Sequence, residues 1–343
     1  MTSLLDSIYS RFSSRNAFFQ KGWGDHSSLG YLLATEPSDI HLRPVKEISV
    51  NWQREKQEKG LLVRSGNFTS PFEFTYEIGK ERTIITLPQE SQKASVLKVL
   101  PKEYTLETPI AIHFAATGDQ GFTRRKHSLA IPLARQGIGS IILENPFYGI
   151  RRPQGQKGDS LEDFTSFLRM SRAATDEGIA LIHYLRQTIG FTTLGVTGVS
   201  MGGYIALTVA ARCNTELATA ACIPCHSASP VYVDGLLSRA CAWQDLQEEL
   251  PPEKDARKYM RQILEMSDIR NFPLPLCPQA AVIVGAKKDG YIPNFSTHII
   301  HKYWSGSTLR WINTGHVGSF LFHRKDFQQA IIDSFRALKK HQE

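Results

Sequence analysis

Two hydrophobic patterns divide the chain. Between residues 60 and 100, short runs of β-branched and aromatic residues are separated by Gly, Pro or Ser. Such runs predict strands, which we expect to begin an antiparallel sheet, at 60–66, 72–76, 83–87 and 95–100. From residue 110 onward, continuous apolar runs alternate with longer amphipathic stretches. This alternation is typical of an α/β protein in which a mostly parallel sheet is covered by helices on both faces.

The second pattern predicts a specific order of elements. Its strands are expected at 110–115, 139–143, 193–199, 217–223, 279–285 and 308–312. Its helices are expected at 124–137, 160–187, 203–211 and 324–340. The stretch 227–278 breaks the alternation with helical pieces and a Pro-rich run. We interpret it as a small helical cap placed over the edge of the sheet, where its apolar residues line an acyl pocket; the alternative is a plain helical excursion on the rim.

Residues 1–24 form an amphipathic N-terminal segment, which leaves 25–343 as a single domain with the cap inserted. The apolar members of the segment fall near one helical face; they are Leu4, Leu5, Ile8, Phe12 and Phe19. Its positive charges come from Arg11, Arg15 and Lys21. The favoured prediction is a helix that packs its apolar face on the domain. The alternatives are a helix that lies on a membrane surface and an organelle presequence.

Composition narrows the class of protein. The 343 residues contain no run of about 20 apolar residues that predicts a membrane-spanning helix, and no secretory signal. The net charge of +7 favours an anionic partner, such as an acidic lipid surface or a phosphorylated substrate. Nucleic acid is not expected, since zinc-finger, RNP-type and repeat signatures are absent. We expect an intracellular protein, soluble or peripheral to a membrane, cytoplasmic in a bacterium or mitochondrial in a eukaryote.

The five cysteines are odd in number and scattered, which favours a reducing compartment without a disulfide framework. Cys222 and Cys225 have CxxC spacing, but no second pair accompanies them. We interpret them as part of a buried strand end; the alternative is a metal or redox role. No metal and no organic cofactor are expected.

The segment Gly198-Val-Ser200-Met-Gly202 lies between a predicted strand and a predicted helix. A Gly-x-Ser-x-Gly motif in this context predicts a sharp turn that exposes a nucleophilic serine at the end of a strand. Small residues are needed on both sides because the strand and helix backbones crowd there. The Met201 N–H, at the start of the helix, would point toward an oxyanion formed at Ser200.

A serine hydroxyl becomes nucleophilic when a base removes its proton and an acid orients that base. Asp289 and His316 each follow a later predicted strand and come in the order serine, acid, histidine. We therefore predict Ser200 as the nucleophile, His316 as general base and then acid, and Asp289 as the residue that orients it. Each also has a plainer interpretation, as a turn aspartate or a loop histidine. The competing histidines are His226, His298, His301 and His323.

The loop 113–121 follows a strand and is rich in small residues. It is expected to supply the second oxyanion donor from the N–H of Gly118 or Thr117. Asp119 is expected to brace this loop by hydrogen bonds. His113 either shares in that bracing or is a core histidine with its bonds satisfied.

Two arginine pairs follow predicted strands on the same edge of the sheet: Arg124 and Arg125, and Arg151 and Arg152. They are candidate contacts for an anionic headgroup. The commoner interpretation is a solvated basic rim.

Several segments together resemble the α/β-hydrolase domain-containing protein eighteen family. They are Gly22-Trp-Gly24, Ala116-Thr-Gly-Asp119 with Arg124-Arg125, Leu143-Glu-Asn-Pro146 with Tyr148-Gly149, Thr197-Gly-Val-Ser-Met-Gly-Gly203, Ala286-Lys-Lys-Asp289 with Tyr291-Ile-Pro293, and Gly315-His316. The resemblance spans about residues 18 to 340. It implies an α/β-hydrolase fold and a triad of Ser200, Asp289 and His316. It also implies a lipid acyl ester as substrate, with mitochondrial association and cardiolipin deacylation in animal members.

The leading hypothesis is a serine hydrolase that cleaves carboxylic esters, of lipids in particular, through an acyl-enzyme. The same triad serves a thioesterase or a peptidase. A third hypothesis is a non-catalytic protein of this fold that binds a ligand or partner. The expected partners are a small-molecule or lipid ester and, peripherally, an anionic membrane.

Overall fold

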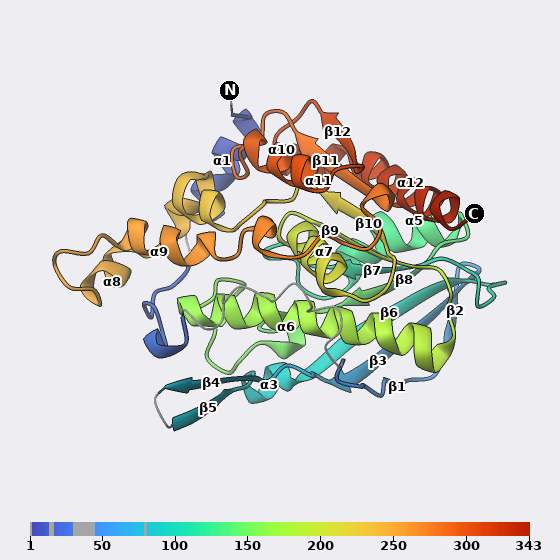
Figure 1. The fold of residues 1–343 in the computed structure, drawn as a ribbon, viewed down its shortest axis with the longest axis horizontal. Coiled ribbons are helices and arrows are strands. Elements are labelled where there is room, and N and C mark those ends of the chain that lie inside the picture. Colours follow the sequence, from blue (N-terminus) through green and yellow to red (C-terminus); the bar gives the residue numbers. More distant parts are fainter. Residues whose placement is uncertain (1, 14–16, 30–44, 79–80) are drawn as a thin grey trace.

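A ten-stranded sheet crosses the molecule in the order β1-β3-β6-β8-β7-β9-β10-β11-β12, with β2 beside β3 (Figure 1). The structure is a computed structural model and describes residues 2–13, 17–29, 45–78 and 81–343. Its strands are β1 (Asn51–Trp52), β2 (Lys56–Glu58), β3 (Leu61–Thr69), β6 (Lys93–Pro101), β7 (Ile110–Phe114), β8 (Gly139–Leu143), β9 (Leu194–Val199), β10 (Ala218–Cys222), β11 (Ala281–Ala286) and β12 (Thr308–Ile312). Neighbours from β8 to β12 pair in parallel, whereas β3 and β6 are antiparallel. The predicted mostly parallel sheet is confirmed.

Two of the expected antiparallel strands lie outside this sheet. β4 (Phe74–Ile78) and β5 (Glu81–Ile85) pair with each other in a separate two-stranded sheet, which projects at the lower left of Figure 1. The prediction that both strands belong to the main sheet is wrong. Hydrophobic alternation predicts a strand but does not choose its partner, and two strands separated by a very short connection pair most readily with each other.

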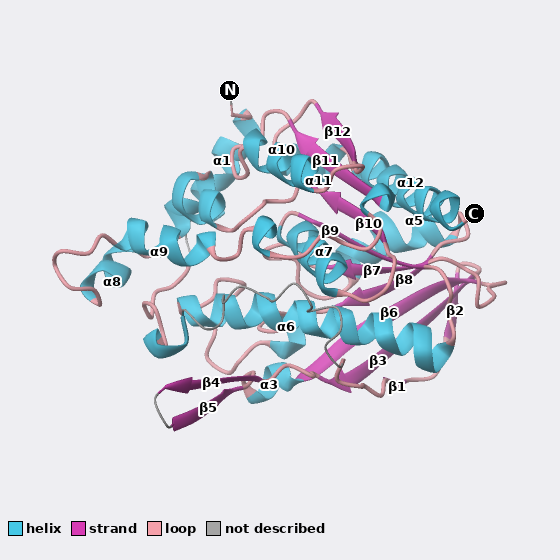
Figure 2. Ribbon diagram, in the orientation of Figure 1, coloured by secondary structure: helices cyan, strands magenta, loops and turns pink. Residues whose placement is uncertain are grey.

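Helices cover both faces of the sheet (Figure 2). On one face, α6 (Phe164–His183) and α7 (Met201–Arg212) pack on Ile110, Ile112 and Phe114 of β7. On the other face, α5 (Ile131–Ala134) and α12 (Arg324–Gln342) pack with Ala111 of β7. Alternate residues of one strand thus enter two different cores. The remaining α-helices are α1 (Leu4–Ser13), α3 (Gln89–Gln92), α4 (Thr123–Arg125), α8 (Trp243–Glu248), α9 (Ala256–Glu265), α10 (Asn294–Tyr303) and α11 (His316–Phe322).

The excursion between β10 and β11 carries α8, α9 and several short 3₁₀ and π turns. The chain near the N-terminus packs into it. Phe18 forms a parallel bridge with Cys241, and the Trp23 indole donates to the Leu246 carbonyl at 2.8 Å. Phe19 and Trp23 are fully buried. Part of the segment 1–24 therefore belongs to the hydrophobic core that this excursion helps to form.

Helix α1 lies against the molecule by its polar face. Asp6 and Ser10 are buried, whereas Leu4 is 75% exposed and Ile8 is 45% exposed. For Leu4, Leu5 and Ile8, the prediction that the apolar face packs on the domain is wrong, because hydrogen bonds of Asp6 hold this helix. The Phe12 side chain lies outside the described part of the structure. Phe19, expected on the same helical face, lies beyond the end of α1 at Ser13.

None of the helices within the described ranges is long and apolar enough to cross a membrane.

Candidate active site

Ser200 occupies a sharp turn between the end of β9 and the start of α7. Its backbone has φ 59° and ψ −122°, a conformation that non-glycine residues rarely adopt. The Ser200 N–H donates to the Cys222 carbonyl at 2.9 Å. A Cβ atom on Gly198 would lie 2.2 Å from backbone atoms of Gly202, and one on Gly202 would lie 2.4 Å from the Phe114 carbonyl oxygen. The two glycines are thus required by close backbone approach.

The structure brings Ser200, Asp289 and His316 together in one hydrogen-bonded chain. The Ser200 Oγ lies 3.0 Å from His316 Nε2, and His316 Nδ1 lies 2.7 Å from Asp289 Oδ2. Asp289 follows β11, and its Oδ1 accepts from two backbone N–H groups of its own loop, at 2.8 Å each. His316 is the first residue of α11, which follows β12. Both side chains are therefore placed by loops at the carboxyl ends of parallel strands.

Opposing effects act on the His316 imidazole. Burial pushes its pKa down, but the negative charge and hydrogen bond of Asp289, together with the charge of Asp6, outweigh that effect. The pKa of His316 is therefore raised above its ordinary value of 6.5. Such an imidazole accepts a proton readily.

The four competing histidines make other contacts. His226 Nδ1 lies 2.7 Å from Ser296 Oγ, and the His298 ring lies against Trp311 with centroids 4.9 Å apart and the ring planes tilted by 45°. His301 Nδ1 is 3.0 Å from Ser307 Oγ, and His323 Nδ1 is 2.8 Å from Asp326 Oδ2. Only His316, of these five, has its hydrogen bond to Ser200.

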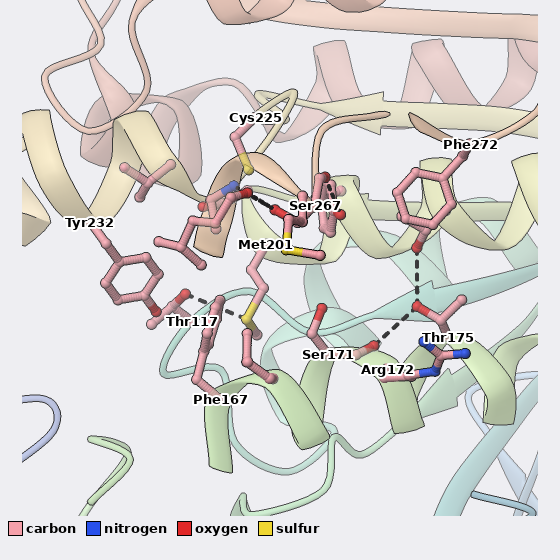
Figure 3. A pocket seen from close by; sticks show the side chains of 18 of the residues that line it. Thr117, Phe167, Ser171, Arg172, Thr175, Met201, Cys225, Tyr232, Ser267 and Phe272 are labelled. Atoms are coloured by element: carbon pink, nitrogen blue, oxygen red, sulfur yellow. Dashed lines mark hydrogen bonds between the residues drawn. The ribbon is translucent and has the colours of Figure 1, made fainter. Parts of the chain in front are cut away.

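Two cavities meet at Ser200 and Thr117. The first, of about 80 Å³, is mostly apolar. Figure 3 shows Phe167 and Tyr232 at one end of it and Phe272 and Arg172 at the other. The second cavity, of about 500 Å³, is more polar. It is lined, among others, by Tyr9, Arg124, Leu237, His316, Leu321 and Arg324.

The two candidates for the second oxyanion donor are placed differently. Thr117 lines both cavities beside Ser200, and its hydroxyl lies 3.7 Å from the Met201 sulfur (Figure 3). The Gly118 N–H instead donates to the Tyr148 hydroxyl at 3.3 Å. The Met201 N–H lies at the first turn of α7, directly after Ser200. The Gly118 N–H thus already has a partner, whereas Thr117 lies beside Ser200.

Of the four arginines predicted near a headgroup, two are buried. Arg125 Nε pairs with Asp119 Oδ2 at 2.9 Å, and its Nη1 donates to the His113 carbonyl at 3.1 Å. Arg151 is fully buried and donates to Glu177 Oε2 at 2.8 Å. Both guanidinium groups hold loops and strands together. Arg151 lines neither cavity, so the prediction of headgroup contact is wrong for it, whereas Arg125 lines the larger cavity and its contact stays a prediction.

The other two arginines remain accessible at the surface. The Arg124 side chain is 59% exposed and lines the larger cavity. Arg152 is partly exposed, and its guanidinium donates to the Gln120 side chain. Of these two accessible arginines, Arg124 lines the larger cavity, which also contains Ser200, and Arg152 does not.

The bracing expected of Asp119 is present in its ion pair with Arg125. His113 belongs to the core, with Nε2 3.0 Å from Ser140 Oγ on the neighbouring strand. Burial lowers the pKa of His113 to about 3, so this imidazole is neutral.

Sequence reasoning missed Asp6. Its carboxylate accepts hydrogen bonds from the backbone of both loops that carry Asp289 and His316, although it lies at the other end of the chain. The only signal in the sequence was an acidic residue in the first turn of a predicted helix, which is common.

All five cysteines are buried free thiols, and burial raises the pKa of Cys225 to about 12. Within the described residues, no three His, Cys, Asp or Glu side chains cluster as a metal site.

Comparison with known proteins supports the fold and shows the family. Similar solved structures include an acetyl xylan esterase from Paenibacillus sp. R4, with a TM-score of 0.60 and 14% identity over 90% of this chain and 98% of that one. Acetyl xylan esterase 1 from Thermoanaerobacterium sp. JW/SL YS485 has a TM-score of 0.54 and 12% identity, over 94% and 98% of the two chains. Est1E from Butyrivibrio proteoclasticus, with bound ferulic acid, has a TM-score of 0.52 and 15% identity, over 71% and 96%.

At these low identities the structural similarity shows a shared α/β-hydrolase fold. The model of the family alpha/beta hydrolase domain containing 18 matches residues 16–256 and 250–337, which is nearly the whole chain. The chain therefore belongs to the alpha/beta hydrolase domain containing 18 family.

Proposed function

We propose that the protein is a serine hydrolase that cleaves carboxylic esters through an acyl-enzyme intermediate. The observation that carries this proposal is the chain of hydrogen bonds from Ser200 through His316 to Asp289, with distances of 3.0 and 2.7 Å. These distances lie within the reach needed for proton transfer between nucleophile and base. In the proposal, Ser200 is the nucleophile, His316 the base and Asp289 the residue that orients it.

The reaction follows from that arrangement. His316 Nε2 takes the proton from Ser200 Oγ as the oxygen attacks the ester carbonyl carbon. The oxyanion that forms accepts hydrogen bonds from the N–H groups of Met201 and Thr117. His316 then protonates the departing alcohol, and the acyl group remains on Ser200. A water molecule, deprotonated by His316, attacks the acyl carbon. The bond from that carbon to Ser200 Oγ then breaks, His316 returns the proton to the oxygen, and the carboxylic acid is released.

We propose a lipid acyl ester as the substrate class. The smaller cavity beside Ser200 is lined largely by apolar side chains, including Phe167, Leu168, Val231, Tyr232, Leu264 and Met266. Such a wall suits an acyl chain, because each buried methylene contributes about 0.8 kcal/mol. The larger cavity, with Arg124 and Arg324 in its wall, suits the alcohol part with an anionic group. Two of the similar structures are named acetyl xylan esterases, so acetyl esters should be tested beside esters of longer acyl chains.

We also propose that the mouth of the larger cavity contacts an anionic lipid surface. Helix α1 packs beside α11. Both helices present apolar side chains to solvent. Leu4 is 75% exposed and Phe322 is 71% exposed, while Tyr9 and Leu321 are exposed and line the cavity. The net charge of +7 favours attraction to an anionic surface.

The test of the activity is labelling with a fluorophosphonate probe, in which the wild-type protein is compared with Ser200→Ala. Labelling of the wild type alone supports an activated serine. Ester substrates of increasing acyl length, with matched thioesters and peptides, then identify the class of acyl donor; a preference for acetyl esters would contradict the lipid proposal. If the folded wild type does not react, the protein is not a serine hydrolase, and the hypothesis of a non-catalytic binding protein replaces it.

A pH profile gives an independent test. The base must be neutral to accept the serine proton, so kcat/KM should rise with pH as His316 loses its proton. Because the pKa of His316 is raised, the midpoint of this rise is expected above pH 6.5. A midpoint below that value would contradict the assigned environment of the base.

A further inference from the structure

Helix α1 is attached to the two loops that carry the proposed base and its orienting acid. Asp6 Oδ2 accepts from the Gly290 N–H at 2.9 Å and from the His316 N–H at 2.8 Å. Asp6 Oδ1 accepts from the Val317 N–H at 2.9 Å. The Ser3 N–H donates to the Lys288 carbonyl at 3.0 Å. One carboxylate therefore joins the loop after β11 to the start of α11.

The contact is close, and two glycines make room for it. A Cβ on Gly315 would lie 2.2 Å from Ser3 Cβ and 2.7 Å from Asp6 Oδ2. A Cβ on Gly290 would lie 2.3 Å from Thr2 Cγ2. The φ of Gly315 is −91°, which other residues adopt freely, so the need for glycine here comes from the approach of α1.

The carboxylate satisfies groups that would otherwise lack partners in their own helix. Gly315 is the N-cap residue of α11 and makes no side-chain capping bond. The first N–H groups of a helix need acceptors, and a negative charge at that end is favourable. Asp6, fully buried, provides both from a distant part of the chain. It thereby holds the backbone of His316 where the imidazole reaches Ser200 and Asp289 together.

We propose that Asp6 is a positioning residue of the active site, which holds the His316 backbone and the Gly290 loop in the register that the proposed triad needs. The inference rests on the proposed function and deepens it. Asp6 acts through His316 and does not touch the substrate. Its effect is on the rate at which Ser200 is acylated and on the protonation of His316.

The charges that face His316 come from several elements. The Asp289 carboxylate is hydrogen-bonded to the imidazole Nδ1, and the Asp6 carboxylate accepts from the His316 backbone N–H. The Tyr291 ring lies 5.1 Å from the imidazole. Arg124 and Arg324 line the same cavity. Asp6→Asn removes one negative charge from this set and leaves the others in place, so the pKa of His316 should fall.

The experiment compares the wild type with Asp6→Asn, Asp6→Ala and the matched control Ser7→Ala, which removes a hydroxyl that donates to the Ser3 carbonyl just before α1. Two readouts are measured on each full-length protein. The first is the rate of fluorophosphonate labelling. The second is the pKa of His316 from an NMR titration of histidine-labelled protein, with the signal assigned through His316→Gln. Thermal unfolding shows which variants are folded.

The expected result is labelling about tenfold slower in Asp6→Ala and about threefold slower in Asp6→Asn, which retains one acceptor, since a cap is worth about one power of ten. The pKa of His316 falls in Asp6→Asn, while Ser7→Ala matches the wild type in both readouts. If Asp6→Ala does not fold, Asp6→Asn carries the test.

Two results distinguish a failure of the role proposed for Asp6 from a failure of the proposed function. Unchanged labelling and an unchanged His316 pKa in Asp6→Asn overturn the role of Asp6 and leave the proposed function intact. A wild type that does not label, with a His316 pKa that still falls in Asp6→Asn, overturns the proposed function and leaves the hold of Asp6 on His316 in place.

Discussion

The first and last α-helices of the chain are both amphipathic, yet they lie against the molecule by opposite faces. Helix α12 buries Phe327, Ile331 and Phe335 against the sheet. Helix α1 buries Asp6 and exposes Leu4 and Ile8. The comparison teaches that a hydrophobic pattern predicts the buried face when apolar burial holds the helix. Where backbone donors in two neighbouring loops hold it instead, a carboxylate turns inward and the apolar face is left to solvent.

The same side-chain truncation on the two helices should give the largest contrast. Ile331 is 1% exposed and Ile8 is 45% exposed. Ile331→Ala is expected to lower the free energy of unfolding by about 2–5 kcal/mol, because it leaves a cavity in the core. Ile8→Ala should change it by less than about 0.5 kcal/mol. Urea denaturation measures both; equal losses would mean that α1 is held by apolar packing after all.

A methyl group added at Gly315 should loosen α1 and leave α12 in place. Gly315→Ala places a Cβ against Ser3 and the Asp6 carboxylate, so α1 is pushed away. Fluorophosphonate labelling is expected to slow about tenfold, as for loss of a helix cap. Hydrogen exchange should become faster in α1 and stay unchanged in α12. Unaltered exchange in α1 would show that the loop absorbs the methyl group elsewhere.

A substitution on the exposed apolar face of α1 should have a smaller effect, which is confined to membrane binding. Ile8→Ser is expected to weaken binding to vesicles that contain phosphatidylglycerol by about fivefold, which corresponds to burial of part of one side chain. Hydrolysis of a soluble short-chain ester should not change, and Ser7→Ala is the control. Binding should be weaker to phosphatidylcholine vesicles. Vesicle flotation tests this; equal binding of wild type and variant would remove α1 from the proposed lipid surface.

The acidic residue on the outer side of α12 should matter least. Burial raises the pKa of Asp333, but hydrogen bonds from Arg310 and Gln329 outweigh it, so this pKa is lowered. Its contribution to stability is present above the unfolded pKa and is lost as pH falls through the folded pKa. Asp333→Asn should therefore cost less than about 1 kcal/mol at pH 7 and nothing in strong acid. If Asp333→Asn still lowers the free energy of unfolding in strong acid, the ion pair of Asp333 with Arg310 is not the source of the loss.

Much of the fold followed from local patterns. The strands that carry Ser200, Asp289 and His316 were predicted within a few residues, because fully buried strands are continuous apolar runs bounded by turn residues. The motif around Ser200 was informative because its glycines are required by backbone contacts between residues close in sequence. The roles of Asp289 and His316 remain part of the proposal, although the structure brings both side chains to Ser200.

What the sequence alone determined is most of the strands and helices, the mostly parallel class of the sheet and the Gly-x-Ser-x-Gly turn, since local patterns of residues indicate each of them. The tertiary structure decided which polar side chains are inside. Arg124 and Arg125 are adjacent, yet the Arg124 side chain is exposed, whereas the Arg125 side chain is buried and donates to the His113 carbonyl. The pairing of β4 with β5 and the inward Asp6 were decided in the same way. A buried charge is placed by hydrogen-bond partners far away in the chain, and no local pattern records where those partners will be.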